Sequence, residues 1–133
     1  MLVEVSEVDD AETVSSVAIP YYDAVLVYAH QAGETALPEL YHLLKASESI
    51  SDHNRILASY HEGRLYLVVV EDRSLKICNS FAAMDFVTAE YFLFMVLKRL
   101  QMNPEISSVH FMTPLTGGQK MSLYRYFKSV EQL

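Results

Sequence analysis

A pair of glycines near the end of the chain is the feature whose type and spacing could do chemistry. Gly117 and Gly118 follow a short apolar run and open a segment with the apolar spacing of a helix. Glycines between a strand and a helix let backbone amides approach a nucleotide, and a helix N-terminus attracts anionic groups. The same pattern also occurs in ordinary turns between a strand and a helix, with no ligand. We favour the ordinary turn, because Pro114 interrupts the segment that leads to the glycines and no second phosphate-binding loop accompanies the pair.

A third glycine, Gly63, follows Glu62 between two predicted strands. A two-residue loop that ends in Gly is typical of a β-hairpin, because Gly accepts a positive φ there. A phosphate-binding hairpin needs an Asp at the end of its first strand and small residues beside it. Tyr60 and His61 stand there instead. We therefore interpret Gly63 as a turn residue.

The polar residues form no recognisable catalytic or metal-binding pattern. The five histidines show no i, i+4 pair, and Cys78 is the only cysteine. A zinc site needs three or four converging ligands, and a two-metal nuclease needs carboxylates on several elements. The predicted strands at 54–61 and 107–113 contain no carboxylate, and Glu90 stands alone on the helix between them. We expect no catalytic residue, no metal and no required cofactor, and thus no enzyme.

Composition excludes several classes of protein. The 133 residues are 51% hydrophobic and 20% charged, as in a globular domain. The net charge of −7 disfavours nucleic acid as a partner. The longest apolar run, residues 91–97, is far shorter than the roughly 20 residues that cross a bilayer. Nor does a basic and then apolar signal segment follow Met1. We expect a cytoplasmic protein that contacts no membrane.

The first 22 residues differ from the rest of the chain. The first twelve hold five acids and no Lys or Arg: Glu4, Glu7, Asp9, Asp10 and Glu12. Valines alternate with these acids, and the stretch that follows is rich in β-branched residues, which favours extended structure. We predict an acidic arm or short strands over residues 1–22, followed by a single α/β domain over residues 23–133.

The order of elements after the arm predicts a fold class. Apolar runs, turn residues and helical spacing predict strands at 23–29, 54–61, 64–71, 73–81 and 107–113, and helices at 37–46, 85–102 and 118–133. The last six elements therefore have the order β-β-β-α-β-α, preceded by short strands and one helix. A three-strand meander, a crossover helix and a strand that can lie parallel to the first give the order of the ribonuclease-H-like fold, which actin-like ATPases contain twice.

Particular residues in this region resemble those of a known bacterial family. "NSF" at 79–81 ends a strand, "DF" at 85–86 precedes the aromatic-rich "YFLFMVLKRLQMNPE" at 91–105, and "LYRYFKSV" at 123–130 follows the last strand. With "DAVLVYAHQ" at 23–31, these residues resemble the Bacteroides-group domain-of-unknown-function family 3822. The resemblance implies an α/β protein with an actin-like ATPase fold, in chains considerably longer than this one.

Two functions remain open from the sequence. We expect an uncharacterised non-catalytic domain that acts through protein–protein contacts, with a protein partner or a second copy, because a domain without its usual partner half would leave a sheet edge or an apolar face uncovered. The alternative is a nucleotide-binding regulatory domain in which Gly117, Gly118 and Gly63 contact ATP or another nucleotide. The resemblance places the first two where actin-like proteins carry the glycines that lie against adenosine.

Overall fold

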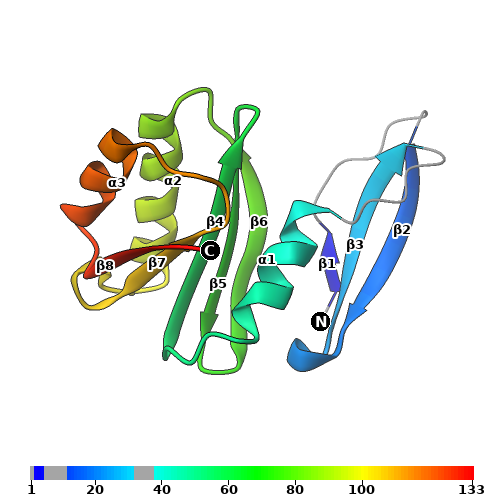
Figure 1. Ribbon diagram of the computed structural model, residues 1–133. Helices are drawn as coiled ribbons and strands as arrows, with labels where there is room; N and C mark the ends of the chain where they lie inside the picture. The colour runs from blue at the N-terminus through cyan, green and yellow to red at the C-terminus, as the bar shows by residue number, and fades with distance from the viewer. Residues whose placement is uncertain (1, 5–11, 32–37) are drawn as a thin grey trace.

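The structure is a computed structural model that describes residues 2–4, 12–31 and 38–133. These residues form four layers (Figure 1): helices α2 and α3, a five-stranded sheet, helix α1 and a three-stranded sheet. Helix α1 therefore lies between the two sheets and contacts both.

The three-stranded sheet comes from the start of the chain. Its order is β1-β3-β2, with β1 (Leu2–Glu4) parallel to β3 (Ala24–Gln31) and β2 (Glu12–Ile19) antiparallel to it. The short 3-10 helix η1 (Pro20–Tyr22) joins β2 to β3. Strand β2 belongs to the stretch assigned to an arm or short strands, and it pairs with β3 along its whole length. The division into an arm and a domain stays a prediction.

The five-stranded sheet has the order β6-β5-β4-β7-β8. Its strands are β4 (Asn54–His61), β5 (Arg64–Glu71), β6 (Ser74–Ala82), β7 (Ser108–Phe111) and β8 (Ser129–Gln132). The first three form an antiparallel meander, and β7 and β8 run parallel to β4. The predicted meander with a returning parallel strand is confirmed, and with it the ribonuclease-H-like fold class.

Local sequence explains where the helices begin and end. Helix α1 covers Glu39–Ser47 and α2 covers Phe86–Arg99, where the Asp85 carboxylate accepts the N–H of Thr88 at 2.8 Å. The 3-10 helix η2 (Pro104–Ile106) follows α2. Helix α3 (Gly117–Tyr124) starts with a capping box. Among the described residues, no helix has the length and apolar content to cross a bilayer.

The prediction of one last helix over residues 118–133 is wrong. Helix α3 ends at Tyr124, and Ser129–Gln132 form β8, which pairs with β7 over four residues. Phe127, just before β8, and Val130, within it, are both buried, at a spacing of three that a helix also allows. Pairing with β7, which is distant in sequence, therefore outweighed the local helical preference of residues 129–132.

The five-stranded sheet is buried on both faces. Along β4, Ile56 and Ala58 face the α2 and α3 layer, whereas Leu57 faces α1. One core holds Leu93 and Leu97 of α2 and Phe111 of β7, and the other joins α1 to Leu26 of β3 and Ile19 of β2. This period of two explains the nearly continuous apolar run of β5, whose alternate residues enter different cores.

Candidate functional site

The structure brings the predicted glycine positions to one end of the five-stranded sheet. Gly63 follows β4, and the loop 112–116 that leads to Gly117 follows the parallel strand β7. The N–H of Met112 donates to the carbonyl of Ala58 at 2.9 Å, so this loop begins beside the end of β4. This end of the sheet is where a ligand of such a fold is expected, outside the carboxyl ends of parallel strands.

Gly63 occupies a tight turn. Its φ is 70°, and that of Glu62 is 53°, so both central residues of the hairpin are in the left-handed region. The carbonyl of Gly63 accepts the N–H of Ala83 at 2.8 Å, which attaches the turn to the end of β6. The geometry gives Gly63 a conformational role. Its contact with a nucleotide stays a prediction.

The loop after β7 uses its own amide groups. The N–H of Leu115 donates to Gln132 Oε1 at 3.1 Å, and the N–H of Thr116 donates to Gln119 Oε1 at 2.9 Å. The Gln132 side-chain amide also donates to the carbonyls of Phe111 and Thr113, both at 2.8 Å. With Met112 bound to β4, these contacts leave few backbone donors in the loop for an anionic ligand.

Tyr60, near the end of β4, contacts three neighbouring elements. Its hydroxyl donates to the carbonyl of Ala83 at 2.8 Å, and its backbone N–H donates to Thr113 Oγ1 at 2.9 Å. Its ring meets the ring of Phe86 edge to face, with centroids 5.7 Å apart. Tyr60 thus connects β4, the end of β6, the start of α2 and the loop after β7, where a phosphate-binding hairpin would need open backbone.

The backbone at Gly117 and Gly118 is open. A Cβ added to either residue meets no other atom within 4 Å, and neither has a positive φ. Neither close packing nor backbone conformation therefore requires glycine at these two positions. Both lie in the first turn of α3, after the Thr116 cap.

A cluster of polar side chains that sequence reasoning missed lies on the α1 side of β4. Ser59 Oγ donates to Glu39 Oε1 at 2.6 Å, and His61 Nε2 lies 3.8 Å from Glu39 Oε2. The His61 ring stacks on Tyr66 with centroids 5.2 Å apart, and burial raises the pKa of Tyr66. Ser59 is fully buried, so its hydroxyl is closed to a substrate. The cluster attaches the start of α1 to the sheet.

Alternation along β4 could have placed Ser59 and His61 on one face. No spacing in the sequence pointed to Glu39 as their partner, because that contact exists only once α1 lies against the sheet.

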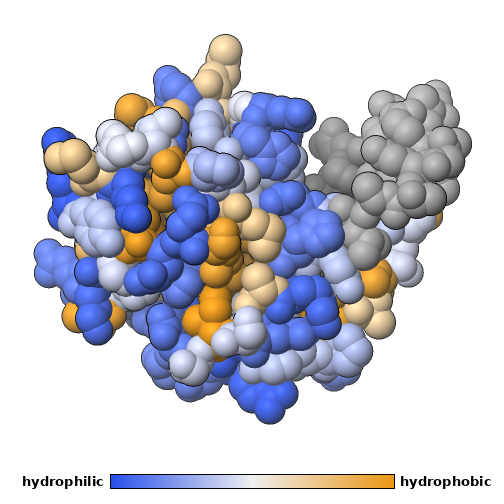
Figure 2. Space-filling view, viewed as in Figure 1, coloured by the Kyte–Doolittle hydropathy of each residue, from blue (hydrophilic) through white to orange (hydrophobic). Residues whose placement is uncertain are grey.

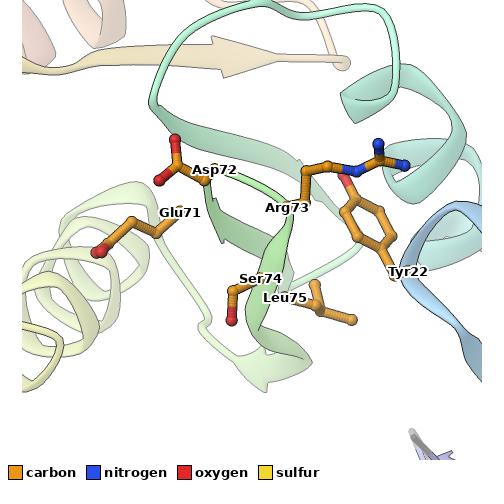
Figure 3. Close-up of a pocket in the computed structure, with 6 residues that line it drawn as sticks. All are labelled: Tyr22, Glu71, Asp72, Arg73, Ser74 and Leu75. Carbon is orange, nitrogen blue, oxygen red and sulfur yellow. The ribbon is translucent and has the colours of Figure 1, made fainter.

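An open pocket of about 600 Å³ lies at the opposite end of β5, around the turn to β6. It is lined by Tyr22, Glu71, Asp72, Arg73, Ser74 and Leu75. In Figure 3, Arg73 extends toward Tyr22, whereas the carboxylates of Glu71 and Asp72 point to the other side. Asp72 Oδ1 instead lies 2.6 Å from His53 Nδ1, and the Arg73 guanidinium lies over the ring of Tyr21. The polar groups do not converge on a ligand.

Two further polar groups, Cys78 of β6 and His110 of β7, are buried. Within residues 2–4, 12–31 and 38–133, no three His, Cys, Asp or Glu side chains are arranged to hold a metal ion. Burial raises the pKa of Cys78 to about 12, so its thiol stays protonated and unreactive. His110 is buried in β7, and its Nδ1 has no hydrogen-bond partner. The side chain of His30 lies outside the described residues.

Comparison with known proteins gives a fold and a family. No curated protein matches the chain. A crystal structure from Bacteroides thetaiotaomicron VPI-5482, of a protein with an actin-like ATPase fold and unknown function, matches with a TM-score of 0.75 at 18% sequence identity. The match covers 96% of this chain and 56% of that one, so this chain spans little more than half the length of its neighbour. The chain has the actin-like ATPase fold.

The family comparison covers almost the whole chain. A model of the family described as "Protein of unknown function (DUF3822)" matches residues 3–130. The resemblance stated from the sequence is confirmed: the chain belongs to family DUF3822.

Proposed function

We propose that this chain is a non-catalytic bacterial actin-like domain of the cytoplasm that acts through protein–protein contacts. The observation that carries the proposal is the internal hydrogen bonding of the hairpin and of the loop after β7, at one end of the five-stranded sheet. The Tyr60 hydroxyl donates to the carbonyl of Ala83, next to the hairpin, and the amides of Met112, Leu115 and Thr116 are bonded within the chain. Phosphoryl transfer depends on open backbone donors and a metal held by acids.

The exposed apolar side chains support a role in contacts. Met84 is 96% exposed, Val87 76% and Tyr91 63%, all at or near α2, and Met121 of α3 is 69% exposed. Figure 2 shows small apolar patches among the polar surface on the side where α2 and α3 lie in Figure 1, and a more continuous one over the middle of the view, where the five-stranded sheet lies. Apolar side chains grouped on a surface are typical of protein interaction sites.

Nucleotide turnover tests the proposal directly. Purified protein with ATP or GTP and Mg²⁺ is expected to release phosphate no faster than buffer alone. Gly118→Ala is the site variant, and it should fold because the added methyl group meets no atom within 4 Å. Metal-dependent turnover that Glu62→Gln or Gly118→Ala abolishes would overturn the proposal.

A second candidate is a nucleotide-binding regulatory domain that uses Gly117 and Gly118. The open backbone at these two glycines favours it, because a base or ribose could approach the first turn of α3. A nucleotide at 100 times its dissociation constant stabilises the fold by about 2.7 kcal/mol. Thermal unfolding with ATP, ADP and GTP measures this, and Gly118→Ala should remove the shift. No shift with any of the three excludes this candidate.

A further inference from the structure

One face of α2 carries a line of apolar side chains that the described part of the chain leaves open. We call Met84, Val87, Tyr91 and Met95 the α2 seam. Met84 lies just before the cap of α2, and spacings of three and four place the seam on one side of the helix. Three members are at least 63% exposed, and Met95 is half-buried. Soluble proteins seldom present such a line to water without a partner.

The two ends of the seam carry opposite charge. Asp85 precedes its first turn, and Lys98 and Arg99 follow its last member. All three side chains are exposed, and neither cation forms a salt bridge with another described residue. Hydrogen bonding to Thr88 lowers the pKa of Asp85, so its carboxylate is ionised at neutral pH. The seam therefore has an anionic start, an apolar middle and a cationic end.

We propose that the α2 seam is an interface between two copies of this chain, whose α2 helices pack antiparallel about a two-fold axis at Tyr91. In this register the two Tyr91 side chains meet at the axis. Val87 of each copy then packs on Met95 of the other, and Asp85 lies beside Lys98 of the other. The inference rests on the proposed role in protein contacts and names the partner as a second copy.

The charge pattern favours a second copy of this chain, and not a different protein, as the partner of the seam. A helix with an acidic start and a basic end becomes its own complement when it is turned round, which is the condition for a two-fold interface. Antiparallel packing also places the negative C-terminus of each helix dipole beside the positive N-terminus of the other. A partner helix of uniform charge would meet a like charge at one end of the seam, which disfavours it.

The first test changes the apolar middle of the seam. Sedimentation velocity over a range of protein concentrations should show a dimer, and Val87→Glu should raise its dissociation constant by about 100-fold or more, because it buries a charge at the contact. Ile106→Glu is the matched control, because Ile106 is 70% exposed but belongs to η2, outside the seam. A parent protein that stays monomeric at every concentration overturns the proposal, as does an equal effect of the two variants.

The second test reverses the charges. Lys98→Glu with Arg99→Glu should weaken the dimer by about tenfold, because like charges then face each other at both ends. Adding Asp85→Lys should restore the parent affinity, because the complement is rebuilt with exchanged signs. Thermal unfolding checks that this triple variant folds without its cap. A folded triple variant as weak as the double variant contradicts the register.

The third test uses a cysteine at the axis and does not depend on the cap. Tyr91→Cys should form an intermolecular disulfide under mild oxidation, because the two positions meet at the two-fold axis. The natural Cys78 is buried and does not compete. Ile106→Cys, the control, should stay reduced at the same protein concentration. A Tyr91→Cys protein that gives no more disulfide dimer than this control overturns the inference.

These results separate the inference from the proposed function. A monomer that hydrolyses no nucleotide overturns the seam and leaves the non-catalytic role standing. A seam dimer that hydrolyses ATP overturns the non-catalytic role and leaves the inference standing.

Discussion

The two faces of the five-stranded sheet are built from different chemistry. The face toward α2 and α3 is apolar and rich in aromatic pairs, such as Phe81 with Phe92 and Phe94 with Phe127. The face toward α1 holds buried polar side chains, among them Arg55, Ser59 and His110. Apolar packing stabilises the fold without requiring a particular orientation of the groups in contact. Buried polar groups, in contrast, need hydrogen-bond partners at fixed positions. The α1 face is therefore suited to fix how the two sheets lie against each other.

Arg55 shows how this orientation is held. Its side chain is almost fully buried and donates to Tyr21 Oη at 3.2 Å, to the carbonyl of Ser47 at 3.4 Å and to the carbonyl of Asp52 at 3.1 Å. The hydroxyls of Tyr22 and Ser47 form a further hydrogen bond. These contacts join η1, the end of α1 and the start of β4. The three-stranded sheet is thus attached to the five-stranded one by directional contacts as well as by its apolar core.

The largest expected effect on stability comes from a substitution in the apolar face. Phe111→Ala should lower the free energy of unfolding by about 3–5 kcal/mol, because it leaves a cavity among fully buried side chains. Urea unfolding followed by circular dichroism measures the loss. Met121→Ala is the control, because Met121 is 69% exposed and its truncation should change stability by less than about 0.5 kcal/mol. Equal effects would contradict the placement of Phe111 in the core.

A smaller effect tests the polar face. Arg55→Leu should lower the free energy of unfolding by about 2 kcal/mol, because the hydrogen bonds from its charged guanidinium to Tyr21, Ser47 and Asp52 are lost. Arg64→Leu is the matched control, since Arg64 is exposed and its guanidinium donates to Ser80 Oγ at 3.0 Å. An Arg55→Leu protein as stable as the parent would mean that apolar packing alone positions the two sheets.

The difference between the faces also decided what the sequence could predict. The β4–β5 hairpin was predicted at its observed bounds, because Glu62 and Gly63 are local turn residues between two clear strands. Strand β8 was missed, because no Gly or Pro ends α3 and the pairing partner β7 lies about 20 residues earlier in the chain. Local sequence patterns were thus sufficient to predict most of the elements that form the apolar core.

The polar contacts of the α1 face escaped prediction for a different reason. Glu39 meets Ser59 only after α1 lies against the sheet, and Arg55 reaches Tyr21 only after both sheets are in place. Side chains joined across elements leave no periodic signal in the sequence. The same holds for the bonds of Gln132 that close the loop after β7.

The smallest expected effect is on the pH dependence of stability, which should have opposite directions for a buried group on each side of the sheet. Burial lowers the pKa of His110 on the α1 face, and the charges of Asp52 and Glu131 oppose that shift only in part. The unfolded state has the ordinary His pKa of about 6.5 and therefore takes up the proton first. Stability is thus full above that pH and falls as the pH drops toward the lower folded pKa. His110→Phe should gain stability relative to the parent between pH 7 and pH 5, measured by urea unfolding at each pH.

Glu90, between α2 and α3, provides the opposite case. Burial raises its pKa, against the hydrogen bond from Ser122 and the charge of Arg125, so its contribution to stability is present at low pH and lost as the pH rises through the folded value. Glu90→Gln keeps an acceptor for Ser122 and removes the ionisation, and its advantage over the parent should therefore be larger at pH 7 than at pH 4. If both variants change with pH in the same direction, the titrating groups that matter lie elsewhere, and the two faces do not differ in the sense argued from their buried side chains.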